Sequence, residues 1–242
     1  DILTTLYFHV MRVNPDAPQA PERDRFVLSK GHCTPALYST LAQRGFFPLE
    51  ELKQFRRIEG HMSGHAEMRH VKGVDMSTGS LGQGISAAVG MALAGKADGR
   101  DYRVYALLGD GEIEEGQVWE AAMAAAKYRL DNLCAVVDVN GLQIDGATAD
   151  VMPSEPLDQK FEAFNWNVIR VDGHDYAALA EAFAAAAACK GKPTVLLART
   201  VKGKGVSFME GDYGWHGKAP NAEQYEKAQA ELSARVAELE GK

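Results

Sequence analysis

The stretch "RVYALLGDGEIEEG" (103–116) decides the fold class of this chain, because it joins a strand-like run to a polar turn. Residues 103–108 are largely apolar, as expected for a strand that is covered on both faces. Gly109-Asp110-Gly111 then interrupts the run, and three glutamates follow within four positions. An ordinary surface turn could have this composition, and so could a site that holds a metal ion and a phosphate. The rest of the sequence distinguishes these alternatives.

Apolar runs of strand length recur along the chain and alternate with helical stretches. This alternation predicts an α/β fold, with a parallel sheet and helices on both of its faces. A charged amphipathic pattern after Pro220 predicts a solvated C-terminal helix. The further strands are expected at 132–139, 166–171 and 194–200, and the helices at 85–96, 116–129 and 176–190.

The composition excludes several classes of partner. The net charge of −7 provides no basic field for nucleic acid or an acidic membrane surface. No apolar run reaches the roughly 18 residues of a membrane span. Cys33, Cys134 and Cys189 form no C-x-x-C pair, which suits a reducing, cytoplasmic setting. The chain opens on "DILTTLYFHVM", which reads as the inside of a helix, so we expect residues to be missing before it.

Two polar residues follow neighbouring predicted strands. Asp110 comes after the strand at 103–108, and Asn140 comes after the next one, in "VVDVNG". Ligands of open parallel sheets bind beyond the carboxyl ends of the strands, and adjacent strands are about 4.8 Å apart. If these strands are adjacent, both side chains reach one point. Mg²⁺ takes about six oxygens, some of them from phosphates, and a backbone carbonyl near Leu142 could supply another.

Gly111 and the glutamates after it fit an anion site at the same place. A glycine lets an anion approach the backbone closely, and the helix that follows would direct its free N–H groups toward it. The simplest interpretation of Glu112 and Glu114 is that they complement the positive end of that helix.

The spacing of these residues is specific. Residues 112–139 separate Gly-Asp-Gly from Asn140, in the order strand end, helix, strand, Asn. This resembles the signature of thiamine diphosphate enzymes. The resemblance implies that Asp110, Asn140 and the carbonyl of Leu142 bind a divalent metal, Mg²⁺ or Ca²⁺, which holds the diphosphate of the cofactor.

Further motifs narrow the family, because in content and order they look like transketolase over nearly the whole chain. A ketose phosphate and an aldose phosphate would then be the substrates, in a two-carbon ketol transfer of the pentose phosphate pathway. The motifs are "LSKGHCTPALYSTLAQRGF" (28–46), "MSGHAE" (62–67), "STGSLGQGISAAVGMALA" (77–94), "GDGEIEEGQVWEA" (109–121), "DVNGLQIDGAT" (138–148), "VDGHD" (171–175) and "GWHGKAP" (214–220).

The resemblance assigns roles to three loop histidines, a residue type that exchanges protons and hydrogen-bonds hydroxyls near neutral pH. It implies that His32 and His216 sit beside the diphosphate and the sugar hydroxyls. His65 would face the hydroxyls of the donor near the thiazolium ring. His174, in a turn before a helix, is better explained by local capping and loop packing.

The resemblance also implies cofactor contacts from backbone and acidic residues. Gly79, Ser80 and Leu81 would pass under the cofactor, and Gly111 would face its diphosphate together with Asn140. Glu115 would lie near the cofactor with a catalytic role. Glu120 would lie near a subunit interface.

The length of the chain suits one large domain, and the resemblance implies that 1–242 forms a single thiamine diphosphate-binding domain of the diphosphate type. In transketolases the glutamate that faces the aminopyrimidine, and the arginines that hold the sugar phosphate, lie on a second domain. This sequence contains no second α/β pattern. We therefore expect the N-terminal chain of a split transketolase, or a truncated whole one, inactive alone in either case. A C-terminal chain with the pyrimidine-binding domain would complete it, in an α2β2 assembly.

Four other interpretations remain at this point. The α-subunit of a 2-oxo-acid dehydrogenase also carries Gly-Asp-Gly and Asn on a separate chain. A 1-deoxyxylulose-phosphate synthase would continue into its second domain. A non-catalytic subunit could bind the cofactor weakly. Finally, residues 82–87 fit the G-x-G-x-x-G/A pattern of dinucleotide folds, but the polar run before them makes a poor buried strand.

Overall fold

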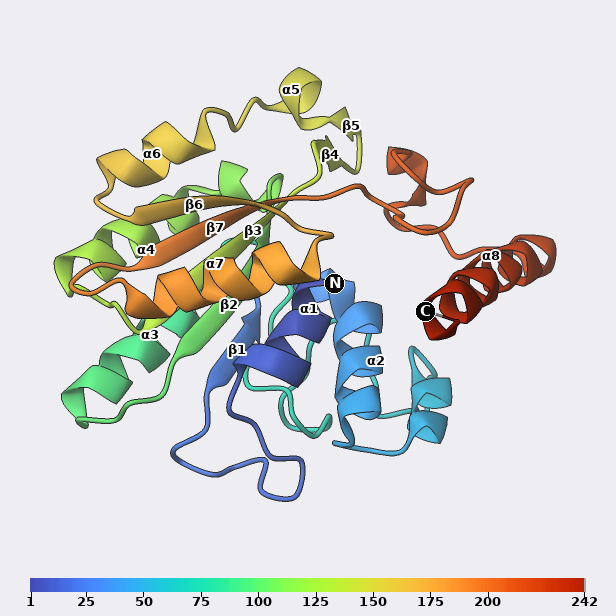
Figure 1. Ribbon diagram of the computed structural model, residues 1–242, viewed down its shortest axis with the longest axis horizontal. Coiled ribbons are helices and arrows are strands. Elements are labelled where there is room, and N and C mark those ends of the chain that lie inside the picture. The colour runs from blue at the N-terminus through green and yellow to red at the C-terminus, as the bar shows by residue number, and fades with distance from the viewer. Residues whose placement is uncertain (242) are drawn as a thin grey trace.

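A five-stranded sheet with strand order β1-β2-β3-β7-β6 forms the centre of the computed structural model, which describes residues 1–241 (Figure 1). All neighbouring strands in it run parallel, which confirms the expected α/β class. The strands are β1 (Arg25–Leu28), β2 (Val104–Gly109), β3 (Leu133–Val139), β6 (Asn167–Asp172) and β7 (Thr194–Arg199), and a separate antiparallel pair comprises β4 (Leu142–Gln143) and β5 (Gly146–Ala147).

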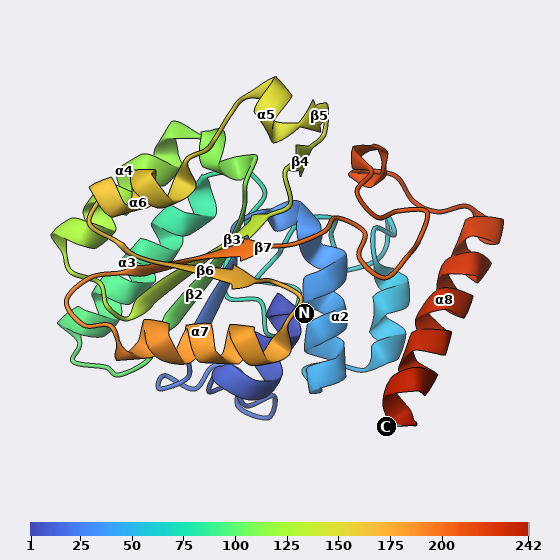
Figure 2. The same ribbon diagram turned by 45° about the horizontal axis from the view of Figure 1, so that its top comes forward.

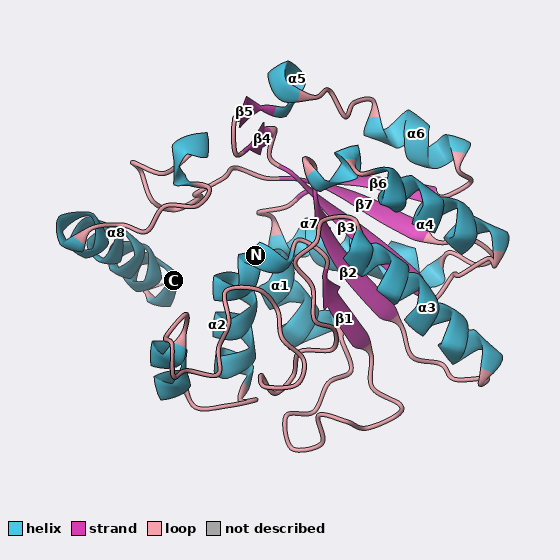
Figure 3. Cartoon of the chain, turned by 180° about the vertical axis from the view of Figure 1, so that it is seen from behind, coloured by secondary structure: helices cyan, strands magenta, loops and turns pink. Residues whose placement is uncertain are grey.

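Helices cover both faces of the sheet (Figures 2 and 3). Residues of α1, α2 and α7 pack with Tyr105 and Leu107 of β2 in one core, and residues of α3, α4 and α6 pack with Val104, Ala106 and Leu108 in the other. Successive β2 side chains therefore alternate between two buried layers. The helices are α1 (Ile2–Thr5), α2 (Thr34–Arg44), α3 (Gln83–Ala97), α4 (Gly116–Lys127), α5 (Thr148–Val151), α6 (Leu157–Ala163), α7 (Tyr176–Ala188) and α8 (Ala222–Glu240).

Helix α8 lies apart from the sheet at the edge of the molecule (Figure 1). It begins with a capping box, in which Asn221 and Gln224 satisfy each other's backbone N–H groups. Ala228 is its one buried residue among those that the structure describes. The expectation of a solvated C-terminal helix is confirmed. Within residues 1–241, no helix has both the length and the apolar character needed to cross a membrane.

The four strands expected from the sequence are all present, and β1 is an additional strand that the sequence analysis missed. It has only four residues, too few for a clear periodic pattern, and it begins with an arginine. It lies at the edge of the sheet and pairs with β2 alone. On its free side the Phe26 N–H donates to Asp75 Oδ2 (2.7 Å), and Arg23 pairs with the same carboxylate.

The dinucleotide-binding interpretation is wrong. It requires a strand immediately before residue 82, and the structure has only turns and loop from 72 to 82 before α3 begins at Gln83. The polar character of that run prevents it from forming a buried strand.

Replacing the carboxylate beside β1 should destabilise the fold. Asp75→Ala leaves the buried Arg23 guanidinium and the Phe26 N–H without their acceptor, so we expect a loss of about 3–5 kcal/mol in the free energy of unfolding. Urea denaturation measures it. Asp98→Ala, at an exposed helix end, is the control and should change stability by less than about 0.5 kcal/mol. A loss at Asp75 no larger than at Asp98 would contradict this account of β1.

Candidate functional site

A cavity of about 970 Å³ lies where the carboxyl ends of β1, β2, β3 and β7 meet. Residues that follow each of these strands line it: His32 after β1, Asp110 after β2, Asn140 after β3 and Lys202 after β7. Parallel strands place their carboxyl ends on one edge of the sheet, and the loops that leave this edge diverge and form a crevice.

Asp110 and Asn140 meet at this edge because β2 and β3 are adjacent, with Gly109 opposite Asp138. Asp110 is only 3% exposed. Its Oδ1 accepts from Gly111 N–H (2.9 Å) and its Oδ2 from Gly141 N–H (2.6 Å). Burial raises the pKa of Asp110, and these two donors act in the opposite direction.

Few oxygen atoms at the ends of β2 and β3 are available as ligands for a metal ion. Asn140 Oδ1 accepts from Leu142 N–H (3.0 Å), and Asn140 and Leu142 both line the cavity. Among residues 1–241 no group of three or more His, Cys, Asp or Glu side chains is placed to hold a metal ion. One carboxylate, one amide and a backbone carbonyl are too few for Mg²⁺ alone, so an ion here would need oxygens from a ligand.

His32 and His216 come together from opposite ends of the chain, with ring centroids 5.1 Å apart. Burial, reinforced by the positive charges of His216, Lys30 and Lys202, lowers the pKa of His32 to about 4. Burial and the same two lysines also lower the pKa of His216. Its Nδ1 is buried and has no hydrogen-bond partner in the part of the chain that the structure describes. Both rings are therefore neutral at pH 7.

Two lysines of this site were not identified from the sequence. Lys30 is buried and pairs with Asp138, which also accepts from the Thr200 hydroxyl. Burial alone would lower the pKa of Lys30, but the Asp138 carboxylate raises it. Lys202 is half-buried, and burial lowers its pKa. Lys30 lies two residues after β1 and Lys202 three residues after β7, in "SKGH" and "TVKGKG". The position just after a predicted strand was an available signal for Lys202, whereas β1 itself was not predicted.

Glu112 does not complement the end of a helix, so that expectation is wrong. Helix α4 begins only at Gly116, after a 3₁₀ turn over Glu112–Glu114. The Glu112 carboxylate is 2% exposed and accepts from the Ser29 hydroxyl, Gly82 N–H (2.9 Å) and Gly109 N–H (3.1 Å). Burial raises the pKa of Glu112, against the effect of these donors. It connects three cavity-forming segments whose buried N–H groups need an acceptor.

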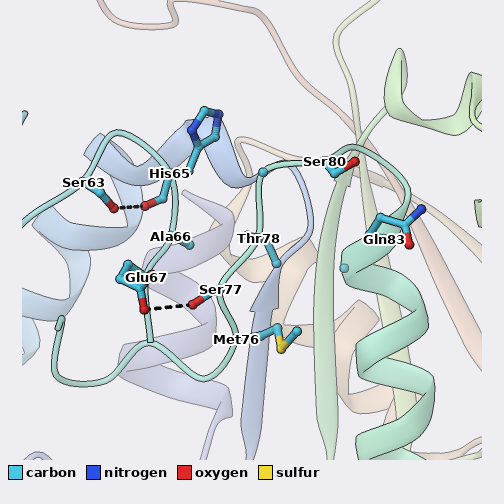
Figure 4. A pocket seen from close by; sticks show the side chains of 11 residues that line it. Ser63, His65, Ala66, Glu67, Met76, Ser77, Thr78, Ser80 and Gln83 are labelled. Carbon is cyan, nitrogen blue, oxygen red and sulfur yellow. Dashed lines mark hydrogen bonds between the residues drawn. The ribbon is translucent and has the colours of Figure 1, made fainter. Parts of the chain in front are cut away.

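Residues of the loop over 77–82 line a second cavity of about 510 Å³, together with Ser63 and residues 65–67 (Figure 4). His65 and Gly79 line both cavities, and Leu81 lines the main one. A side chain at Gly79 would lie 3.1 Å from the His65 ring, so glycine permits this close packing. Ser80 lines only the second cavity.

The loops that carry the predicted residues are bound to one another. Thr78 donates from its hydroxyl to the Leu28 carbonyl (2.6 Å), and Ala66 N–H donates to the Gly31 carbonyl (3.2 Å). The structure thus brings His32, His65, Gly79, Leu81, Asp110, Gly111, Asn140, Leu142 and His216 to one cavity. Glu115 and Glu120 are exposed and do not line it.

Glu112 gives a stability prediction. Glu112→Gln turns one carboxylate oxygen into an NH₂ donor that faces N–H or O–H donors, so we expect a loss of about 1–3 kcal/mol in urea denaturation. Glu114→Gln is the matched control in the same turn, because a glutamine carbonyl can still accept from Gln143 Nε2 (2.8 Å in the native chain). Equal stability of the two variants would show that the Glu112 contacts do not hold the loops.

Comparison with known proteins agrees with this geometry. Residues 1–238 match the family described as "Transketolase, thiamine diphosphate binding domain". The 6-deoxy-6-sulfo-D-fructose transketolase subunit SqwG of Clostridium sp. (strain MSTE9) is 48% identical over 232 residues, which are 96% of this chain and 84% of that protein. An apulose-4-phosphate transketolase subunit of Phocaeicola vulgatus is 46% identical over 240 residues, 99% of this chain and 85% of that one.

A solved structure gives the same result for the fold. Transketolase from Campylobacter jejuni superposes with a TM-score of 0.88 at 34% identity, covering 96% of this chain. This chain spans only 37% of that structure. The chain therefore belongs to the transketolase family, of which it carries the thiamine diphosphate-binding domain.

Proposed function

We propose that this chain is the thiamine diphosphate-binding subunit of a two-chain transketolase. The enzyme would transfer a two-carbon ketol unit from a ketose phosphate to an aldose phosphate. The observation that carries the proposal is the partnerless buried His216 Nδ1, in a cluster with His32, Lys30 and Lys202, beside Asp110 and Asn140. Two lysines, a buried ring nitrogen without a partner and a small set of oxygen ligands in one cavity fit a metal-bound diphosphate.

The donor set fits a hard divalent cation such as Mg²⁺ or Ca²⁺. Asp110 would supply the charged ligand, Asn140 an amide oxygen and Leu142 a backbone carbonyl. No group of three or more His, Cys, Asp or Glu side chains in the described chain is placed to hold the ion, which is consistent with diphosphate oxygens completing the shell. Gly111 would leave room for that group, and Lys202 would balance its charge.

Thiamine diphosphate, when bound, supplies an electron sink that permits cleavage of the bond next to a ketone carbonyl. The chain's own residues would orient the substrates. His32 and His216, neutral at pH 7 because their pKa values are lowered, each offer one donor and one acceptor to a hydroxyl. His65 would face the donor sugar, and Gly79 to Leu81 would pass under the cofactor. Glu115 would lie near the cofactor with a catalytic role, and Glu120 near the subunit interface.

The partner would supply what this domain lacks. The similar proteins from Clostridium and Phocaeicola are named as subunits, which supports assembly with a second chain. That chain would carry the pyrimidine-binding domain, in an α2β2 arrangement with residues 1–242 as one diphosphate-binding domain. The names of these relatives include a sulfonated and a phosphorylated sugar, so a sugar with a terminal anion is the substrate class that we propose.

The alternatives differ in their support. The family match over 1–238 argues against the α-subunit of a 2-oxo-acid dehydrogenase, and also against a 1-deoxyxylulose-phosphate synthase. A non-catalytic subunit is disfavoured because the proposed metal donors and all three loop histidines meet at one cavity. Binding measurements distinguish it from the catalytic subunit.

Removal of the charged metal ligand should abolish metal-dependent binding. We expect Asp110→Ala to weaken thiamine diphosphate binding on the order of 100-fold, because it removes the only carboxylate proposed to bind the metal. Isothermal titration calorimetry with the co-purified partner, with Mg²⁺ and with EDTA, measures this. Asp98→Ala is the control and should bind like the native chain. No binding by the native complex in Mg²⁺ would favour the structural subunit.

Cys33 reports on occupation of the cavity. It is half-buried, lines the cavity next to His32, and should become protected from iodoacetamide when thiamine diphosphate and Mg²⁺ bind. Cys189 is also half-buried but does not line the cavity, so its alkylation rate should not change. Peptide mass spectrometry of the complex follows both thiols. An unchanged Cys33 rate at saturating cofactor would place the cofactor elsewhere.

A further inference from the structure

His174 lies in the turn that follows β6, where it connects two loops at the edge of the cavity. Its own backbone is fixed, because Gly173 N–H donates to the Arg199 carbonyl (2.8 Å) and His174 N–H to Asp172 Oδ1 (2.9 Å). Its side chain, 22% exposed, reaches the loop after β7, where Val201 N–H donates to Nε2 (2.8 Å). The local packing role expected from the sequence is thus accompanied by a specific contact.

This contact determines the protonation state of the ring. A nitrogen that accepts a hydrogen bond carries no proton, so Nε2 is unprotonated and Nδ1 carries the proton of the neutral ring. Nδ1 lies 2.6 Å from Asp1 Oδ2 and donates to it. Asp1 also accepts from the Tyr176 hydroxyl (2.6 Å). The carboxylate therefore selects the tautomer that can accept from Val201.

Val201 lies between two residues of the cavity wall. Thr200 is held by its hydroxyl donating to Asp138, and the Lys202 carbonyl accepts from Gly211 N–H (2.9 Å). The Val201 N–H bond to His174 is a further anchor of the same short segment. The Lys202 ammonium forms no salt bridge within residues 1–241, so this backbone mainly determines where its charge lies.

We propose that His174 is a positioning residue of the cofactor site: its unprotonated Nε2 fixes the Val201 backbone and thereby directs Lys202 toward the diphosphate. The proposal rests on the function proposed above and adds a residue to the same site. His174 itself touches neither cofactor nor substrate in this role. An acceptor on the neighbouring loop of the same cavity would determine how well the Lys202 ammonium meets the ligand.

The role predicts a specific pH dependence. Burial lowers the pKa of His174, so the contact persists above that lowered pKa and is lost as the pH falls through it. A proton on Nε2 would face the Val201 N–H, and the segment would shift. The charged groups around the ring are Asp172 on β6, Asp138 on β3, Asp1 before α1, and Lys204 and Glu210 after β7. The Tyr176 hydroxyl on α7 also lies beside it.

Three substitutions separate this role from simple packing. Glutamine can place its Oε1 near the position of Nε2 and accept from Val201 N–H without titrating, whereas asparagine reaches only the Nδ1 position. In calorimetric titration of thiamine diphosphate with Mg²⁺ into the complex at pH 7.5, His174→Ala and His174→Asn should each raise Kd about 10-fold. His174→Gln should stay within about threefold. His61→Ala, at an exposed histidine that pairs with Glu51, is the control.

A double-mutant cycle tests the route through Lys202. If His174 acts by directing that ammonium, His174→Ala should cost little more in a Lys202→Ala background, and the two losses should not add. Below the pKa of His174, the affinity of the native complex should fall toward that of His174→Ala, while His174→Gln should not show this additional loss.

Each result has a defined meaning. Unchanged affinity in His174→Ala, an equal loss in the Gln and Asn variants, or additive losses with Lys202→Ala would overturn the proposal. Loss in Ala and Asn with rescue by Gln would support it. Failure of the native complex to bind the cofactor would instead contradict the proposed function. Thermal unfolding of the cofactor-free variants shows whether they fold.

Discussion

The parallel pairing of β2 with β3 is the constraint on which the site depends. The register places Gly109 opposite Asp138, so the chain leaves both strands at the same height and Asp110 reaches the turn that follows Asn140. A shift of one residue would move every side chain of β2 to the other face and bury apolar groups wrongly. Burial of both faces of the sheet therefore fixes the register of β2 and β3. That register in turn fixes the position of the polar site, which is not part of the core.

The cavity contains polar groups that the fold alone leaves without a partner. Lys30 is paired with Asp138, whereas Lys202 forms no salt bridge and His216 Nδ1 has no hydrogen-bond partner in the described chain. Burial of the His32 and His216 rings, reinforced by the charges of Lys30 and Lys202, lowers their pKa values. A bound anion would offset the repulsion among Lys30, Lys202 and the histidine rings. Anion binding is therefore expected to stabilise the folded loops, and folded loops to favour binding.

The loops around the cavity have little regular structure, and individual buried acceptors hold them. Glu112 connects the segments at Ser29, Gly82 and Gly109, and His174 connects the turn after β6 to the loop after β7. Backbone N–H groups in irregular segments need partners as much as those in strands do. Side-chain acceptors thus hold these loops in place, as the hydrogen bonds between strands hold the sheet. The positions of the site residues are therefore fixed although they lie on loops.

The sequence by itself determined the α/β class, four of the five strands and the residues around Gly-Asp-Gly, because strand runs and glycine-bounded motifs are local patterns. It did not reveal β1, whose partner strand β2 and edge acceptor Asp75 both lie far along the chain. Nor did it show that Glu112 turns inward, or that His174 accepts from Val201. These depend on which N–H groups the folded chain leaves without a partner. Such groups become apparent only when distant segments have been brought together.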